Sequence, residues 1–137
     1  MQKKLFASLL VTVALICACA LAASAVGTLA DDGVYEISTA KELDTLAKEI
    51  ADGKSGVRNQ KYRLTADIDM SEITDMIPIG VDRYAFIGEF DGNGKTVSGI
   101  KMNAETSASP VRVGFGFFGK VSNATIKNLT LKGDIHL

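Results

Sequence analysis

The sequence predicts a mainly β protein that begins a β-solenoid, with an amphipathic helix covering its first coil. Two similar segments, Thr96–Met102 and Thr125–Leu131, read T-V-S-G-I-K-M and T-I-K-N-L-T-L. A period of roughly 20–50 residues, within which their spacing falls, is typical of stacked repeats. Residues around both copies alternate as they do in strands, and a helical pattern precedes them. Stacked β coils with a helical cap account for all three observations.

The N-terminal segment, positions 1–25, is predicted to be a secretory signal peptide. Lys3 and Lys4 precede a nearly continuous apolar run, and Ala23-Ser24-Ala25 matches the small residues at a cleavage site. A single transmembrane anchor is one alternative. A lipoprotein attached through Cys19 is another, although the preceding residues are a poor match to a lipobox. The expected location is extracytoplasmic, either secreted or on the cell surface.

Charge and cysteine content limit the possible functions of the mature chain. Both cysteines, Cys17 and Cys19, lie in the leader, so cleavage after Ala25 excludes a disulfide framework. Loss of Lys3 and Lys4 leaves 13 of the 15 basic residues against 16 acidic ones, a net charge of −3. This weakly acidic balance argues against nucleic-acid or anionic-membrane binding.

Residues 26–60 are predicted to hold a linker (residues 26–32), a first strand (residues 34–37) and the capping helix. Thr39 and Glu42 have the spacing of a capping box, and Gly53 stands where a helix commonly ends. An apolar stripe runs along the predicted helix. The charged residues on its other face are expected to be solvated: Lys41, Asp44, Lys48 and Glu49.

Residues 61–137 are predicted to form the coils. The two repeat copies should stack in register, so their apolar residues should meet in one core: Val97, Ile100 and Met102 with Ile126, Leu129 and Leu131. On that prediction, Ile126→Asp would bury an unpaired charge and abolish folding. The polar closing segment expected of a complete solenoid is missing from the sequence. The chain is therefore expected to be a C-terminally truncated piece of a longer protein or, alternatively, to associate end to end.

The mature chain resembles bacterial secreted and surface proteins with GLUG-type right-handed parallel β-helices. The similarity runs from Tyr35 to Leu131 through landmarks in a fixed order: Ile37–Leu46, Leu64–Met70, Ile77–Gly80, Phe86–Gly94 and Val113–Leu131. Gly114–Gly119 departs from the family pattern by an extra Gly-Phe. The resemblance implies a right-handed parallel β-helix without catalytic residues on this segment.

Two glycine-rich motifs resemble nucleotide sites but lack the required context. Gly114-x-Gly116-x-x-Gly119 fits the dinucleotide fingerprint, yet β-type residues follow where a helix is needed. Gly92–Thr96 ends like a phosphate-binding loop, but Glu89 occupies the position of its first glycine. Both motifs are better explained as tight turns, and we expect no bound cofactor.

Acidic residues at predicted turns allow a structural calcium ion. Asp67, Asp69, Asp91 and Asn93 are weak candidates for its ligands, because hard cations prefer oxygen donors. A helix-loop-helix calcium site does not fit the spacing. Carboxylate pairs also occur in β-helix polysaccharide lyases.

The expected function is a non-catalytic, adhesin-like structural or binding module of a bacterial surface or secreted protein. Its partner would be an extracellular polysaccharide or a host or cell-surface protein. Two alternatives place catalytic residues beyond Leu137: a β-helix polysaccharide-cleaving enzyme, or a surface metallopeptidase to which this segment is accessory. Contact with a membrane is expected only through the leader or an anchor outside this sequence.

Overall fold

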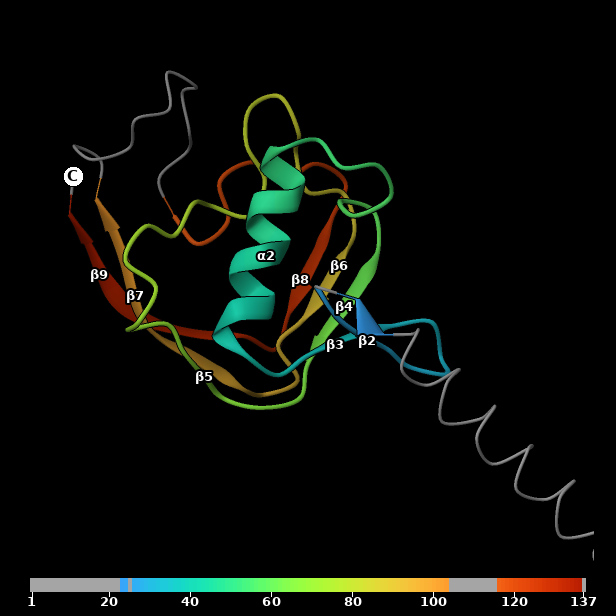
Figure 1. The fold of residues 1–137 in the computed structure, drawn as a ribbon, viewed down its shortest axis with the longest axis horizontal. Helices are drawn as coiled ribbons and strands as arrows, with labels where there is room; N and C mark the ends of the chain where they lie inside the picture. Colours follow the sequence, from blue (N-terminus) through green and yellow to red (C-terminus); the bar gives the residue numbers. More distant parts are fainter. Residues whose placement is uncertain (1–22, 25, 104–115, 137) are drawn as a thin grey trace, which may run out of the picture.

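The computed structural model describes residues 23–24, 26–103 and 116–136 as a mainly β protein with one short helix among them (Figure 1). The larger sheet has six strands, in the order β1 (Ala23–Ser24), β2 (Gly27–Leu29), β3 (Tyr35–Ile37), β4 (Lys61–Leu64), β6 (Glu89–Asp91) and β8 (Thr125–Lys127). The smaller sheet has three, in the order β5 (Ile68–Asp69), β7 (Thr96–Asn103) and β9 (Thr130–His136).

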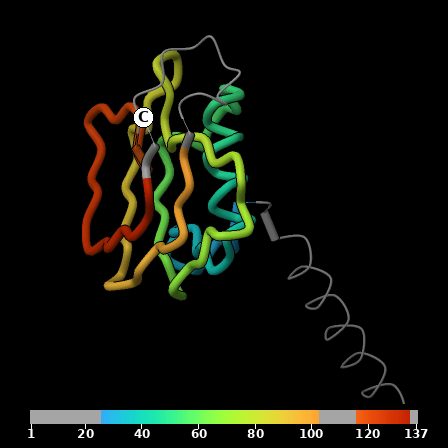
Figure 2. Tube along the Cα trace, turned by 90° about the vertical axis from the view of Figure 1, so that its left-hand side faces the viewer, coloured from blue at the N-terminus to red at the C-terminus, as the bar shows by residue number. Residues whose placement is uncertain are grey.

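Parallel strands arrange the chain in layers. β3, β4, β6 and β8 pair in parallel, and so do β5, β7 and β9. Each layer carries one strand of each sheet, so that β4–β5, β6–β7 and β8–β9 form three successive layers. Figure 2 shows them side by side, with α2 (Ala40–Ala51) at one end and the β8–β9 layer at the other. Elements far apart in sequence are therefore neighbours along the stack.

The N-terminal part of the larger sheet differs from the prediction. Residues 26–32, predicted to be a linker, contain β2, which pairs antiparallel with β3 through Thr28–Glu36 and Leu29–Tyr35. The segment is too short and too rich in small residues to show the alternation that identifies a strand. Its pairing occupies the edge of β3 that β4 does not use.

The predicted capping box of α2 is confirmed. Thr39 Oγ1 accepts a hydrogen bond from Glu42 N at 3.2 Å, and Glu42 Oε2 accepts one from Thr39 N at 3.0 Å. Gly53 follows the C-cap with φ +74°. The helix buries one face against the sheets, because its spaced apolar residues all face the core: Leu43, Leu46, Ala47 and Ile50.

Asp44 contradicts the expectation of a fully solvated polar face on α2. Asp44 is only 8% exposed, and its Oδ2 accepts a hydrogen bond from Lys48 Nζ at 2.6 Å. Asp44 lies one position after buried Leu43, close enough to the apolar stripe for neighbouring elements to cover it. Sequence periodicity alone places Asp44 at the boundary of the stripe and does not show what packs there.

The core prediction is right for β7 and wrong for the second copy of the repeat. Val97, Ile100 and Met102 are buried, as expected. Ile126 and Leu131 remain 39% and 43% exposed, and Leu129 is partly buried. An exposed Ile126 also removes the reason for expecting Ile126→Asp to abolish folding.

The predicted stacking of the two copies on each other is also wrong, because the register of the repeat differs. The sequence alignment matches Thr96 with Thr125, but β7 pairs Thr96 with Thr130 and Val97 with Leu131. Thr125 instead pairs with Glu89, in the other sheet. A turn through Asn128, at φ +55°, divides the second copy between β8 and β9. The two copies are alike in composition but are not structural equivalents.

Some sequence predictions concern residues outside the described ones. These are the leader up to Ala22, cleavage after Ala25, the two cysteines, and the Gly114 end of the glycine motif. In the described part of the chain, no helix is long and apolar enough to span a membrane.

Candidate interaction surface

A row of alternating charges crosses the outer face of the larger sheet. Strand register places Glu36 beside Arg63, Arg63 beside Asp91, and Asp91 beside Lys127. We call these four residues the charge ladder. Their side chains point away from the inward-facing residues of the same strands, such as Tyr62 and Phe90, because successive side chains of a strand point to opposite faces. Opposite charges therefore face each other at every step from β3 to β8.

Ion pairs form along the charge ladder and beside it. Arg63 Nη2 lies 2.8 Å from Glu36 Oε1, and Arg63 Nη1 lies 3.0 Å from Asp32 Oδ2. Lys127 Nζ lies 2.6 Å from Glu89 Oε1 and 3.8 Å from Asp91 Oδ2. Each basic side chain thus bridges two carboxylates, which favours this strand register over one that brings like charges together.

Two carboxyl groups of this surface, Glu89 and Asp91, have a lowered pKa. The hydrogen bond and charge of Lys127 hold the pKa of Glu89 below its ordinary 4.5. Hydrogen bonds from the Asn128 side chain and the Asn93 backbone hold the pKa of Asp91 below 3.8. In return, Glu89 raises the pKa of Lys127. Glu89, Asp91 and Lys127 are therefore all ionised at neutral pH.

Acid should lower the free energy of unfolding partly because it protonates Glu89 on this surface. Because the pKa of Glu89 is depressed in the folded state, its contribution to stability is present above about pH 4.5 and is lost as pH falls through the lowered folded value. Lys127→Met removes the lysine that lowers the pKa of Glu89. We therefore expect the urea midpoint of this variant to fall less between pH 7 and pH 2.5 than that of the wild-type chain. Lys41→Met, at an exposed position of α2, is the control and should leave that fall unchanged. Equal acid sensitivity of both variants would contradict this assignment.

The calcium candidates lie in turns or at strand positions next to turns, where they hold the backbone. Asp67 Oδ1 accepts a hydrogen bond from Thr96 N of the next layer, and Asp69 Oδ1 accepts one from Ser71 N, both at 2.9 Å. Asn93 Nδ2 donates to Leu64 O of the preceding layer at 3.1 Å.

Asp91 holds the following turn in the same way. Its Oδ1 accepts hydrogen bonds from Asn93 N at 2.8 Å and Asn128 Nδ2 at 3.0 Å. Within the described residues, no group of three acidic, histidine or cysteine side chains could hold a metal ion. All four candidates thus have structural contacts that their sequence motif does not reveal.

The glycine motifs also lie at turns and strands. Gly92-Asn93-Gly94 links β6 to β7, with Gly92 N donating to Lys127 O at 2.8 Å and Gly94 N donating to Asn128 O at 2.9 Å. Phe117 is buried beside Gly116, and its ring packs edge-on against Phe90 and Phe118. These contacts agree with the prediction of tight turns and core-filling phenylalanines.

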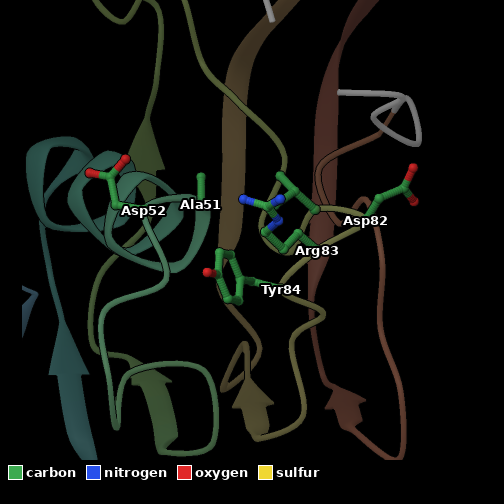
Figure 3. Close-up of a pocket in the computed structure, with 6 residues that line it drawn as sticks. Ala51, Asp52, Asp82, Arg83 and Tyr84 are labelled. Carbon is green, nitrogen blue, oxygen red and sulfur yellow. The ribbon is translucent and has the colours of Figure 1, made fainter. Parts of the chain in front are cut away.

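A shallow cleft of about 620 Å³ lies at the C-terminal end of α2 (Figure 3). Ala51, Asp52, Arg83 and Tyr84 contribute to its lining. The Tyr84 ring lies against Gly53, where a Cβ atom would come 2.4 Å from Tyr84 Cζ. The Arg83 guanidinium points toward Ala51, whereas the neighbouring Asp82 carboxylate points away (Figure 3). No sequence motif points to this cleft, because Asp52 and Arg83 are distant in sequence.

The outermost layer exposes apolar side chains. Val121, Ile126 and Leu131 are 46%, 39% and 43% exposed. Their partners one layer inward are fully buried: Phe86 opposite Val121, Phe90 opposite Ile126, and Val97 opposite Leu131. The three residues therefore continue rows of core residues, with less covering than their inner partners have.

The chain is similar to segments of two much longer proteins. Halomucin of Haloquadratum walsbyi is 33% identical over an alignment of 125 residues, and the match covers 82% of this chain and 1% of that protein. A protein of Evansella cellulosilytica named as a Gly-rich membrane protein is 30% identical over an alignment of 105 residues, and the match covers 73% of this chain and 11% of that protein. The chain thus spans only a small part of these curated relatives. No family model matches it. No solved structure matches it either.

Proposed function

We propose that this chain is a non-catalytic structural and binding module of a bacterial secreted or cell-surface protein. In this proposal the module is the capped start of a right-handed parallel β-helix of the GLUG type. Its outer faces would contact an extracellular polysaccharide or a protein of a cell surface.

The observation that carries the proposal is the repetition of the same strand register from layer to layer. Tyr35 pairs with Tyr62, and Tyr62 pairs with Phe90, at nearly the same spacing along the chain. Each step places an inward side chain on an inward side chain and a charged residue on its opposite. Such stacking lets a chain extend by repeated layers while it keeps one continuous core.

The helix and the relatives support the same proposal. α2 packs its apolar face at one end of the stack, where an uncovered layer would otherwise expose core residues. The two relatives are a halomucin and a protein named as a membrane protein, and this segment is a small fraction of each. A module within long surface proteins fits both findings.

The structural reading also accounts for the charged residues. Arg63 and Lys127 pair with carboxylates on neighbouring strands of an outer face. Asp67 and Asp91 hold turn backbone. These side chains therefore have roles in strand register and turn geometry that require no substrate.

Location and processing test the proposal. An antibody raised against the purified protein should label intact cells of the source organism, or detect the protein in the medium. N-terminal sequencing of the exported form should begin at Val26. As a matched control, Leu10→Arg with Leu15→Arg would place charges in the apolar leader and should retain the protein inside the cell. Labelling only after permeabilisation would refute an extracytoplasmic module.

A further inference from the structure

β9 is the longest strand with one side unpaired in the described part of the chain. It runs from Thr130 to His136 at the edge of the smaller sheet, with β7 as its neighbour. β9 belongs to the outermost layer, at the end opposite α2 (Figure 2). An edge of this length presents a row of backbone donors and acceptors that can pair with another strand.

The sequence of β9 is complementary to itself about Gly133. In an antiparallel pair centred there, Lys132 of one strand faces Asp134 of the other, and the reverse contact forms by symmetry. Residues directly opposite each other in an antiparallel pair point to the same face of the sheet, and successive residues alternate between faces. The charges would therefore meet on one face, and Leu131 would lie on the other.

The register to β7 supports that division of faces. Leu131 pairs with buried Val97, whereas Asp134 pairs with exposed Lys101. The irregularity in this ladder lies between Val97 and Ile100 of β7, so β9 itself keeps its alternation. Gly133 fits closely against β7, because a Cβ atom there would come 2.6 Å from Ile100 O.

Charge complementarity selects one register among those with the same faces. Moving the centre of the pair to residue 132 places Lys132 against Lys132 of the other copy. Moving it to residue 134 places Asp134 against Asp134. Like charges directly opposite each other destabilise strand pairing. The arrangement centred on Gly133 is the one that pairs both charges.

We propose that two copies of this chain associate by antiparallel pairing of their β9 strands about a two-fold axis at Gly133. The two three-stranded sheets would then become one continuous six-stranded sheet. Such a contact is isologous, since the same surface serves both partners. It would also cover Leu131, which a single chain leaves 43% exposed.

A charge-exchange experiment on the full exported chain tests this contact. Sedimentation equilibrium over a range of concentrations should show a dimer. Lys132→Asp sets two acids against each other at both symmetric positions and should weaken dimerisation about 10-fold or more. Asp134→Lys sets two lysines against each other and should weaken it similarly. Lys41→Asp, on exposed α2, makes the same charge change as Lys132→Asp away from β9 and should leave the dimer unchanged.

Mixing the two weakened variants gives the decisive measurement. A Lys132→Asp chain and an Asp134→Lys chain are complementary to each other at both positions, so their mixture should form a heterodimer. Circular dichroism and urea unfolding check that each variant is folded, since Asp134 also faces Lys101 in its own chain. A heterodimer in the mixture, with weak association of each variant alone, supports the contact.

Three results would overturn the proposal. One is a wild-type chain that stays monomeric at all concentrations. Another is a dimer that Lys132→Asp leaves unchanged. The third is a longer chain from the same gene in which following residues protect the β9 amides from hydrogen exchange. That last result would identify a further layer, and not a second copy, as the neighbour of β9.

Discussion

Phe90→Ala should destabilise the fold by about 3–5 kcal/mol, because it empties the centre of the stack. The Phe90 side chain is fully buried in the middle layer. Its ring lies 5.4 Å from the ring of Phe118 and 6.4 Å from that of Phe117, measured between centroids, and both contacts are edge-on. Loss of the ring would remove these contacts and leave a cavity between Tyr62 and Ile126. Urea unfolding followed by circular dichroism measures the effect.

Ile126→Ala is the matched control, in the same row and one layer further out. Ile126 pairs with Phe90 in the strand register but is 39% exposed, so its truncation should cost about 1 kcal/mol. Similar losses at the two positions would contradict the difference in burial on which this prediction depends. A dimer that covers the outer layer would reduce the difference in destabilisation between the two variants. Both variants are therefore compared at concentrations where the chain is monomeric.

Gly80→Ala should cost about 3–5 kcal/mol for reasons of backbone conformation and space together. Gly80 has φ +83°, and a Cβ atom there would come 2.1 Å from Lys120 O and 2.9 Å from Phe86 N. Lys120 N donates to Gly80 O at 3.0 Å, and Phe86 N donates to Lys120 O at 2.9 Å. The alanine methyl group would break these backbone hydrogen bonds, which hold the outermost layer. The same unfolding measurement applies.

Gly56→Ala separates the two causes. Gly56 has a nearly identical φ of +80°, but no heavy atom lies within 4 Å of the position its Cβ would occupy. Its substitution should therefore cost only the conformational penalty, about 1 kcal/mol. Equal destabilisation at both glycines would show that the backbone conformation alone sets the loss and that the outer layer can yield at Gly80.

Local signals in the sequence predicted α2 well. Thr39, Glu42 and Gly53 act through neighbours a few residues away, so their spacing is sufficient to place both ends of the helix. The pairing of the β segments was harder to predict, because their partner strands are distant in sequence. Sequence similarity matches Thr125 with Thr96, whereas the tertiary fold pairs Thr125 with Glu89. Burial of Val97 was predictable from alternation, whereas exposure of Ile126 depends on what covers its layer.

The candidate surface depended on information that one sequence does not carry. The members of the charge ladder are unequally spaced along the chain, so no fixed period brings them together: Glu36, Arg63, Asp91 and Lys127. Their alternating sign becomes visible only after the strands are aligned. The acidic turn residues were recognisable as turn formers. The hydrogen-bond donors that belong to another layer, such as Thr96 N for Asp67 and Asn128 Nδ2 for Asp91, were not predictable from the sequence.

The alternating charges of the outer face have a consequence for how such a chain can change length. Removal of the single layer that contains β4 would bring Glu36 against Asp91, two acids in direct opposition. Removal of the β4 and β6 layers together would bring Glu36 against Lys127 and keep every contact attractive. The same reasoning applies to insertion. Duplication or deletion is thus compatible with the charge ladder when layers are gained or lost in pairs. The number of layers would then change in even steps, so that opposite charges stay next to each other.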